Sequence, residues 1–535
     1  MMNRICRYFA DDLRKLGLYE EKAALHAYVG DIHNHCGISY GYGSIENAVA
    51  FAANQLDFFS VTGHFAWPDM EDDESKRIPE DVIAYHKEGF AKLRRNWQHY
   101  RQVMAEAEKI GLLPFLSYEY HSFEYGDYTI LCRSLEEDLP SPVMEGERDE
   151  RLTKLLSGDE SQTERFLATP HHIGYKTGYR GINWKHFNEK VSPLVEIVSM
   201  HGCAESEEAR PAYLHTMGPR SMRNTYQGGL KEGHHFGVAG STDHHNAAPG
   251  SYGSGRTVVF LEKLTRDNVW NALRNRKTSA VTGDPVETLL IVNGHEAGEV
   301  APIHDGTLEL EAFAAGYDRL EKVEIIQDGK VIASQYDFGC EKPLKGTEEG
   351  FVSLRFGWGK KHLPAVWDVN ISVAGGELLS VLPRFRGIDM VDPLDVPSDC
   401  GSVIPAVHFA DGKVFLHAVT DGNPTAQTDS TAGLALELKG DDSTLICIDA
   451  AVSWNGEKLI RQYMIPLADL CEGQVTEYVN GFVSPAIEAG RFRRTSECTA
   501  HICAKVKTDS TGAVYMRAYE KNGDAVFTSP VSFRL

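Results

Sequence analysis

The chain has 535 residues, of which 42% are hydrophobic and 24% are charged, as is ordinary for a globular protein. Its formal net charge is -22. An acidic surface of this kind argues against a general nucleic-acid partner or an anionic membrane, although a local basic pocket for a small anion stays open. The length exceeds that of one compact domain, so two or three domains are expected.

The ten cysteines are scattered and form no CxxC pair, which is typical of reduced thiols. Residues 1–17 carry charges throughout and lack the apolar core of a secretory signal. The sequence also lacks an apolar run of roughly 18 residues, the length that crosses a bilayer. We therefore expect a cytoplasmic protein without a membrane partner.

From residue 28 to about 284, strand-like apolar runs alternate with helical patterns. A helix is expected over 44–55 with Ser44 as its N-cap, followed by a strand at 56–62. Pro79 begins a long amphipathic helix that Gly111 ends. The runs LLPFLSYEY, YTILCRS, RFLATP, LVEIVSM and FGVAGST then indicate successive buried strands, and 264–278 indicates a last helix. The alternation predicts an α/β fold, with a parallel sheet or barrel inside a layer of helices.

After residue 284 the pattern changes to short β-rich runs separated by Asp-Gly, Asn-Gly and Gly-Gly turn signals. This pattern predicts one or two antiparallel β-sandwich modules. We place the boundary at Asp284-Pro285, which gives an α/β domain over 1–284 and a β-sandwich region over 285–535.

Metal-binding side chains are concentrated where apolar strands end. Sixteen of the 22 histidines precede residue 285. The strand-end groups are His33 and His35, His64, Glu119, His171 and His172, Glu196 and His201, and Asp243 to His245. Residues i and i+2 of a strand face the same way, so His33 and His35 can converge on one point. Imidazoles mixed with a few carboxylates suit zinc, manganese or iron, and the C-terminal strand ends of a barrel share one face.

The ordered motifs GDIHNH, VTGH, SYEYHS, TPHH, VEI and GSTDHH resemble those of the polymerase and histidinol phosphatase (PHP) superfamily over roughly residues 28–284. The stretch from APGSYGSGRTVVF to LIVNG, together with a β-rich end like FTSPVSF, resembles a bacterial PHP-like group of unassigned function. The resemblance implies a distorted seven-stranded, TIM-like α/β barrel with a two- or three-metal phosphoesterase centre.

Carried over motif by motif, the resemblance implies metal ligands at His33, His35, His64, Glu119, His171, Asp243 and His245, with Glu119 as the bridging ligand. His172 is then a neighbour that could contact substrate, and His244 is structural. Three departures stand out: Tyr40 and Asp127 lie where relatives often have further ligands, and Gly63 replaces the aspartate of the usual TDH motif. We expect two divalent ions (Mn, Zn or Fe), with a third one either weakly bound or absent.

Beyond the ligands, a water activated by two metal ions that Glu119 bridges could attack a phosphoester, with His172 or His201 protonating the leaving group. Arg180 and Arg256 follow strand ends and are candidates for binding the anionic part of a substrate. Trp67, in the loop 64–79, could form an aromatic wall. Each has a plainer alternative: the histidines may support ligands only, the arginines may hold loops, and the loop may be a solvated excursion.

The leading hypothesis is a metal-dependent hydrolase, a PHP-type phosphoesterase acting on a small phosphorylated substrate. Two alternatives stay open. The same activated water could attack an amide, lactone or glycosidic bond, or the chain could be a non-catalytic binding protein with a vestigial metal site. The role of residues 286–535 and a homo-oligomeric state are not decided by the sequence.

Overall fold

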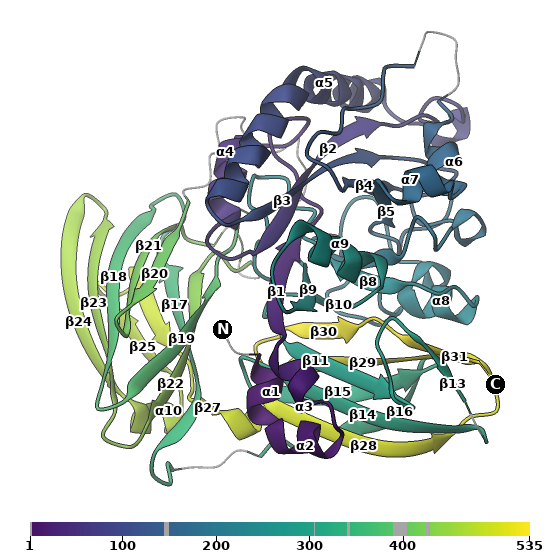
Figure 1. Cartoon of the computed structure of the whole chain (residues 1–535). Coiled ribbons are helices and arrows are strands. Elements are labelled where there is room, and N and C mark those ends of the chain that lie inside the picture. The colour runs from purple at the N-terminus through teal and green to yellow at the C-terminus, as the bar shows by residue number, and fades with distance from the viewer. Residues whose placement is uncertain are drawn as a thin grey trace.

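The computed structural model describes residues 3–143, 149–303, 305–339, 343–388, 404–423, 425 and 428–534. The molecule is a strand-rich α/β protein, in which one large mixed sheet is accompanied by several smaller sheets. Helices are concentrated in the first half of the chain, and the second half is almost entirely strands (Figure 1). None of the helices in the described ranges is both long and apolar enough to cross a membrane.

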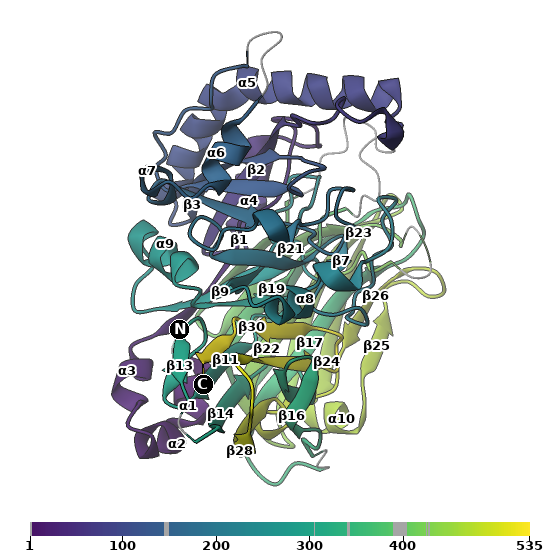
Figure 2. The ribbon, with the colours of Figure 1, turned by 90° about the vertical axis from the view of Figure 1, so that its right-hand side faces the viewer.

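The first part of the large sheet carries the strands whose ends bear the histidines. Its elements are β1 (His26–Asp31), α4 (Ile45–Ala52), β2 (Phe58–Ala66), α5 (Glu80–Lys109), β3 (Leu113–Tyr120), β4 (Tyr128–Cys132) and β5 (Phe166–Pro170). Ser44 caps α4 and Pro79 precedes α5, so both predicted helices are confirmed. The helix α5 lies across β2 and β3 (Figure 2). Only β1, β2 and β3 are parallel, because β4 and β5 are antiparallel to their neighbours.

The predicted closed seven-stranded barrel is not confirmed, since the large sheet does not close among the described residues. A separate small sheet is formed by β6 (Leu194–Ser199), β7 (Gly202–Cys203) and β8 (Gly237–Gly240). It lies beside β9 (Arg256–Leu261) and β10 (Thr278–Val281) of the large sheet. Side-chain hydroxyls make the link there: Thr257 Oγ1 donates to Gly240 O at 2.7 Å, and Thr278 Oγ1 donates to Val238 O at 2.6 Å.

The N-terminal helices belong with the second half of the chain. They are α1 (Arg4–Tyr8), α2 (Ala10–Lys15) and α3 (Tyr19–Ala23). They lie against the sheet that contains β11 (Glu287–Val292), β14 (Thr307–Ala315) and β28 (Thr499–Lys507) (Figure 1). Phe9 and Leu13 share a buried apolar cluster with Phe313 and Ala315. Residues 4–23 therefore pack across the boundary expected at Asp284-Pro285.

The large sheet continues across that boundary as well. Its C-terminal strands are β29 (Gly512–Glu520), β30 (Ala525–Thr528) and β31 (Val531–Arg534), joined by β13 (Val300–Pro302), β15 (Leu320–Gln327) and β16 (Lys330–Gln335). The strand β30 pairs antiparallel with β10, with Ala280 opposite Phe527. Buried Asp284 also accepts a 2.9 Å hydrogen bond from Arg384 Nε. The division into 1–284 and 285–535 stays a prediction, and the two halves share a sheet.

Between these segments, two antiparallel sheets share one apolar core. The first contains β17 (Glu348–Trp358), β19 (Glu377–Arg384), β22 (Ala432–Gly440), β25 (Val475–Tyr478), β26 (Pro485–Ala489) and β27 (Arg493–Arg494). The second contains β18 (Ala365–Ala374), β20 (Ala406–Ala410), β21 (Lys413–Thr420), β23 (Leu445–Trp454) and β24 (Glu457–Pro466). Leu354, Trp367, Leu436 and Ile448 are buried in the shared core. The predicted change to antiparallel β structure after residue 284 is confirmed for this segment.

Candidate metal centre

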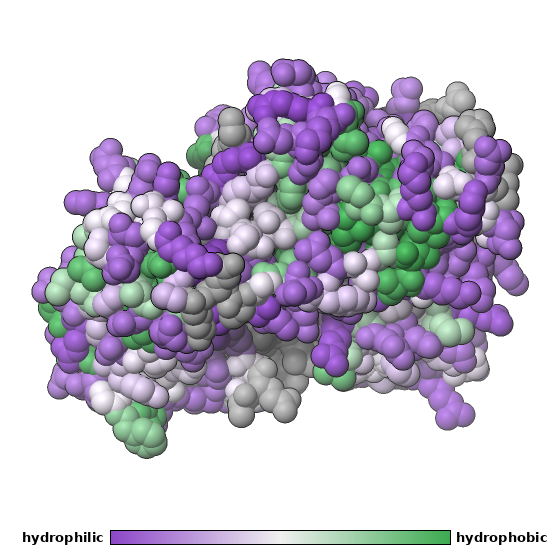
Figure 3. Space-filling view, turned by 90° about the horizontal axis from the view of Figure 1, so that it is seen from below, coloured by the Kyte–Doolittle hydropathy of each residue, from purple (hydrophilic) through white to green (hydrophobic). Residues whose placement is uncertain are grey.

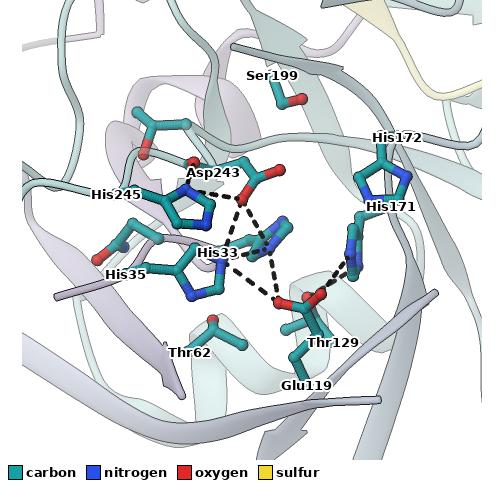
Figure 4. Close-up of polar contacts among 12 residues, drawn as sticks. His33, His35, Thr62, Glu119, Thr129, His171, His172, Ser199, Asp243 and His245 are labelled. Atoms are coloured by element: carbon teal, nitrogen blue, oxygen red, sulfur yellow. Dashed lines mark hydrogen bonds and ion pairs between the residues drawn. The ribbon is translucent and has the colours of Figure 1, made fainter. Parts of the chain in front are cut away.

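The structure brings the seven predicted ligands into one cluster, and all of them except His64 are labelled in Figure 4. His33 and His35 follow β1, His64 lies in β2, and Glu119 lies in β3. His171 follows β5, and Asp243 and His245 follow β8. Six of the seven are buried, and His245 is half-buried. These residues converge although the sheets do not close among the described residues. The side-chain hydrogen bonds from β9 and β10 to β8 keep the end of β8 beside the end of β1.

Glu119 occupies the middle of the cluster. Its Oε2 lies 3.3 Å from His35 Nε2 and 3.6 Å from the Nε2 atoms of both His33 and His64. Its Oε1 lies 3.1 Å from His171 Nε2. Oε2 is buried and has no hydrogen-bond partner among the described residues. A buried, unpartnered carboxylate oxygen facing three imidazole nitrogens fits a site for cations, because such an atom is costly unless it is paired or coordinated.

Asp243 completes a second group of ligand atoms. Its Oδ1 lies 3.0 Å from His35 Nε2 and 3.4 Å from His33 Nε2. The backbone places it there, since Asp243 N donates to His33 O at 2.7 Å and His35 N donates to His244 O at 2.8 Å. Asp243 adopts a φ of 52°, a left-handed conformation uncommon for a residue with a side chain. The loop after β8 is therefore fastened directly to the loop after β1.

Several overlapping sets of three residues each place one ligand atom apiece within 4.8 Å of one another. Five of them are His33, His35 and Asp243; His35, His64 and His245; His33, Glu119 and His171; His64, Glu119 and His121; and Asp127, His171 and His172. Five residues each belong to two of these sets: His33, His35, His64, Glu119 and His171. The donor atoms are imidazole nitrogens and carboxylate oxygens, a mixture that suits zinc, manganese or iron.

A further layer of side chains orients the imidazoles. Glu196 Oε2 lies 2.8 Å from His33 Nδ1, and Ser39 Oγ lies 3.0 Å from His64 Nδ1. Each contact occupies Nδ1 and so leaves Nε2 directed at the cluster, which is how outer residues fix the tautomer of a metal-binding histidine. Gly63 has no side chain that could orient His64, and a Cβ at this position would lie 2.2 Å from Leu93 Cδ1. Ser39 orients His64 in its place.

The electrostatics of the cluster favour neutral imidazoles at His64 and His171 beside an ionised Glu119, whereas the pKa of His33 is raised by Asp243 and Glu196 against the effect of burial. Burial lowers the pKa of His171 to about 4 and holds the pKa of His64 well below its ordinary value. Burial alone would raise the pKa of Glu119, but the neighbouring imidazoles, His121 and His171 first, outweigh it and hold that pKa well below its ordinary value. Neutral imidazole and carboxylate are the forms in which these groups bind metal ions.

His121 is a candidate ligand that the sequence reasoning missed. Its Nδ1 lies 3.1 Å from Glu119 Oε1 and 3.0 Å from Asp127 Oδ2. The hydroxyl of Tyr40 lies 2.7 Å from His121 Nε2, and the Tyr40 ring stacks on His64 with centroids 3.4 Å apart. The signal was available, because His121 stands two residues after Glu119, the spacing that pairs His33 with His35.

The two arginines predicted to bind substrate lie in different places. Arg180 lines the cavity at the cluster, where its Nε donates to Asp127 Oδ2 at 2.6 Å and its Nη2 lies 3.9 Å from Glu119 Oε1. Arg256 is fully buried and does not line this cavity; its Nε donates to Gly250 O at 2.9 Å. The prediction for Arg256 is therefore corrected: it holds the 244–252 loop in place.

Trp67 lies behind Arg180 and does not line the cavity. Its ring lies 5.0 Å from the Arg180 guanidinium carbon and packs near His121 with centroids 5.4 Å apart. The loop that carries Trp67 is fastened down, since Asp69 accepts hydrogen bonds from Ser122 Oγ at 2.8 Å and from backbone N–H groups of residues 123 and 124. Trp67 supports Arg180 and forms no aromatic wall in this conformation.

A cavity of about 230 Å³ opens over the cluster and is small enough to select a compact substrate. The predicted catalytic residues Glu119, His172 and His201 all line it. His201 Nε2 lies 2.9 Å from Asp243 Oδ2, and its Nδ1 lies 2.7 Å from the Tyr175 hydroxyl. His172 Nε2 lies 3.3 Å from Asp127 Oδ2. Both histidines thus face the cavity while contacting carboxylates of the centre.

Comparisons with known proteins leave the family undetermined. No family model matches the chain. Uncharacterized proteins of Chlamydia muridarum and Chlamydia trachomatis are 26% identical over 204 and 197 residues, which are 35% and 34% of this chain and 32% and 31% of theirs. The chain thus spans about a third of the length of these relatives. A solved two-domain protein from Bacteroides vulgatus, described as containing a predicted PHP-like metal-dependent phosphoesterase, is 17% identical with a TM-score of 0.33 and covers 57% of this chain and 80% of its own.

Proposed function

We propose that the chain is a metal-dependent hydrolase whose substrate is a small phosphoester. The observation that supports this most is the position of Glu119, whose buried and unpartnered Oε2 faces imidazole nitrogens on one side while Oε1 faces His171 on the other. A carboxylate between two groups of ligands is suited to bridging two cations. The motifs that resemble the PHP superfamily contribute the same residues.

Two divalent ions fit the residues present. His33, His35 and Asp243 would hold one ion. Glu119 would contact both this ion and a second one, which would lie at His171 or at His64 and His121. Bound ions of this type supply a water of lowered pKa and positive charge for the oxygens of the phosphoester. Tyr40 fills the space beside His64 and His121, which favours two ions over three.

The chain's own side chains supply the remaining needs of phosphoester hydrolysis. Arg180 adds positive charge to the cavity wall, and Asp127 keeps its guanidinium oriented. The Tyr175 hydroxyl holds the imidazole of His201 through Nδ1, so that Nε2 points toward Asp243 and can carry a proton at the cavity. The small volume of the cavity limits the size of the substrate that can reach the cluster.

Hydrolysis of an amide, lactone or glycosidic bond remains the second candidate, and one observation favours it. Arg180 is the cationic side chain nearest Glu119 in the described structure, and Asp127 already pairs with it at 2.5 Å. An ion-paired guanidinium attracts a phosphate less strongly than a free one. The two candidates share the metal centre and differ in the substrate that turns over.

The test combines metal analysis with turnover. The full chain is purified without added metal, its metal content per chain is measured by elemental mass spectrometry, and small phosphoesters, lactones and amides are screened. We expect manganese, zinc or iron, loss of activity on chelation, and recovery when manganese or zinc is returned. His171→Ala should lose metal and activity, and His99→Ala, which removes an exposed histidine of α5, should lose neither.

The proposal fails if the chain holds less than half an equivalent of metal that His171→Ala leaves unchanged and that reconstitution does not increase. In that case the vestigial binding protein becomes the better reading. Turnover of a lactone or amide without turnover of any phosphoester would retain the metal centre and replace the substrate class.

A further inference from the structure

A second cluster of metal-binding side chains lies far along the chain from the centre just described. It consists of Glu311 on β14 with His501 and Cys503 on β28. These strands lie in the sheet that carries the N-terminal helices, at the lower edge of the molecule (Figure 1). Seen from below, this face of the molecule mixes hydrophilic and apolar groups, and a large apolar group lies right of the centre of the view (Figure 3).

The backbone register places the three side chains on one face of the sheet. Glu311 is directly opposite Cys503 in the antiparallel pair of β14 and β28. His501 precedes Cys503 by two residues, so both point to the same side of the strand. Directly opposite residues have Cβ atoms about 4.5 to 5.5 Å apart. The proximity of the three groups therefore follows from strand pairing, and it does not depend on the rotamer of a single long side chain.

The three possible ligand atoms meet at one point. Glu311 Oε2 lies 2.6 Å from His501 Nε2 and 3.0 Å from Cys503 Sγ, and Sγ lies 3.2 Å from His501 Nε2. Tetrahedral bonds to zinc of about 2.0 to 2.3 Å would separate such atoms by roughly 3.3 to 3.6 Å. Glu311 is half-buried and Cys503 is exposed, so both side chains can move by the roughly 0.3 to 0.7 Å that an ion needs.

The histidine of this cluster is held as a ligand would be. Its ring stacks on Phe313 with centroids 4.2 Å apart and an interplanar angle of 15°, and Phe9 of the N-terminal helices packs edge-on at 6.1 Å. Asp12 Oδ2, on α2, lies 3.5 Å from His501 Nδ1. A carboxylate near the second ring nitrogen favours the tautomer that presents Nε2 to a metal, and such partners are typical of zinc-bound histidines.

The surroundings leave a coordination position open. A cavity of about 660 Å³ lies beside Glu311 and Cys503, and its wall includes Leu18 and Lys505. The ammonium of Lys505 is engaged by Glu309 at 2.5 Å, and that of Lys15 is engaged by Asp12 at 3.1 Å. Both cations are thus turned to carboxylates other than Glu311. Water or a small ligand could reach an ion at the cluster from the cavity.

We infer that Glu311, His501 and Cys503 form a second metal site, which binds a single zinc-like ion through one oxygen, one nitrogen and one sulfur. Thiolate with imidazole selects borderline or soft ions such as zinc, in contrast to the sulfur-free centre around Glu119. Because Asp12 reaches the site from α2, a bound ion would fasten the N-terminal helices to the sheet of β14 and β28. The inference does not depend on the hydrolase activity proposed above.

The test uses cobalt as a probe of sulfur ligation. The metal-depleted full chain is titrated with Co²⁺, and the near-ultraviolet charge-transfer band of a cobalt thiolate is recorded. We expect this band in the wild type and in Asp243→Asn, which damages only the centre around Glu119. Cys503→Ser should abolish the band and lower the zinc content by one equivalent per chain. Cys447→Ser, a matched change at a half-buried cysteine of β23, should leave both unchanged.

A second variant tests the outer carboxylate. Asp12→Asn keeps all three ligands and should weaken Co²⁺ binding about tenfold while the band retains its shape. The inference is overturned if the wild type shows no thiolate band at saturating Co²⁺, or if the band and the zinc content survive Cys503→Ser. Since the band reports sulfur ligation alone, loss of the hydrolase centre would not imitate either result.

Discussion

Glu196 is a buried carboxylate that contacts one of the predicted ligands of the candidate metal centre. Its Oε2 lies 2.8 Å from His33 Nδ1. The ring nitrogen of His33 that stays available to a cation is therefore Nε2. Glu196→Gln keeps the shape of the side chain but removes its charge. We expect metal affinity to fall by about 10- to 100-fold.

This change in affinity is measured by competition with a chelator of known strength. The matched control is Glu46→Gln, at an exposed position of α4, which should leave the affinity at the wild-type value. Equal affinities for Glu196→Gln and wild type would show that His33 orients itself without this partner.

The pKa of Glu196 predicts that the stability of the metal-free protein depends on pH. Burial raises the pKa of Glu196 to about 7, compared with about 4.3 in an unfolded chain. The folded state therefore binds this proton more tightly, so the stabilisation is complete below pH 4.3 and is lost as pH rises through 7. His33, whose pKa is raised by Asp243 and Glu196 against the effect of burial, acts in the same direction.

Urea unfolding of the metal-free chain at a series of pH values checks this sign. The free energy of unfolding of the wild type should fall more steeply between about pH 4.3 and 7 than that of Glu196→Gln. Parallel curves for the two proteins would mean that Glu196 titrates normally in the folded state.

At this scale the sequence identified much of the candidate site. Strand alternation indicated that His33 and His35 converge, and the resemblance of the strand-end motifs to those of the PHP superfamily implied the full set of ligands. The position of Arg256 could not be predicted, because the sequence pattern does not distinguish an arginine that faces a cavity from one that faces a loop carbonyl. The exclusion of a side chain at Gly63 by Leu93 depends on packing between β2 and α5, which no local pattern encodes.

Among the elements, β8 pairs with β6 through the backbone but is joined to β9 and β10 by threonine hydroxyls, where a barrel would have backbone pairs. Thr278 Oγ1 donates to Val238 O at 2.6 Å and lies 2.9 Å from Ser529 Oγ. Thr278→Val preserves the shape but leaves a buried carbonyl unpaired. We expect a loss of about 1 to 3 kcal/mol in the free energy of unfolding.

Chemical denaturation measures this loss, and Thr153→Val provides the comparison. Thr153 is exposed on α6 (Arg151–Leu156), so its replacement should change the free energy of unfolding by less than about 0.5 kcal/mol. Equal stability of the Thr278 variant and wild type would show that β8 is held by other contacts.

The helices and strands themselves were largely predictable, because Ser44, Pro79 and the apolar runs mark their bounds. Whether the sheet closes was not predictable. A run such as FGVAGST indicates a strand but does not indicate whether that strand pairs with a further neighbour. The antiparallel direction of β4 and β5 also escaped prediction. Direction depends on the connection in space, and alternation of apolar residues does not record it.

Across the whole molecule, Arg384 and Asp284 join the first half of the chain to the antiparallel sheets of the second. Asp284 is fully buried and accepts from Arg384 Nε and from Asn522 Nδ2 at 3.0 Å. Arg384→Leu would leave a buried carboxylate without its cation. We expect a loss of about 3 to 5 kcal/mol in the free energy of unfolding.

Differential unfolding at neutral pH checks this loss, with Arg95→Leu, on the exposed face of α5, as the matched arginine variant. Adding Asp284→Asn to Arg384→Leu should recover part of the lost stability, because the unpaired charge is removed as well. A double variant less stable than Arg384→Leu would contradict this account.

The arrangement of the two halves lay beyond the reach of the sequence. Phe9 packs against Phe313, and β10 pairs with β30, although hundreds of residues separate the partners along the chain. A composition change near residue 284 marks where the local pattern alters. It carries no information on which distant segments return to complete a sheet.

The pairing of β10 with β30 has a consequence for synthesis on the ribosome. Residues 278–281 emerge well before residues 525–528, and at about 5 to 20 residues per second the interval is on the order of tens of seconds. Throughout that interval the edge of β10 presents unpaired N–H and C=O groups, which can template association with another nascent chain. The protein should therefore need chaperones most while only its first half has been synthesised. Slowing elongation within residues 285–524 should lower the yield of folded chains.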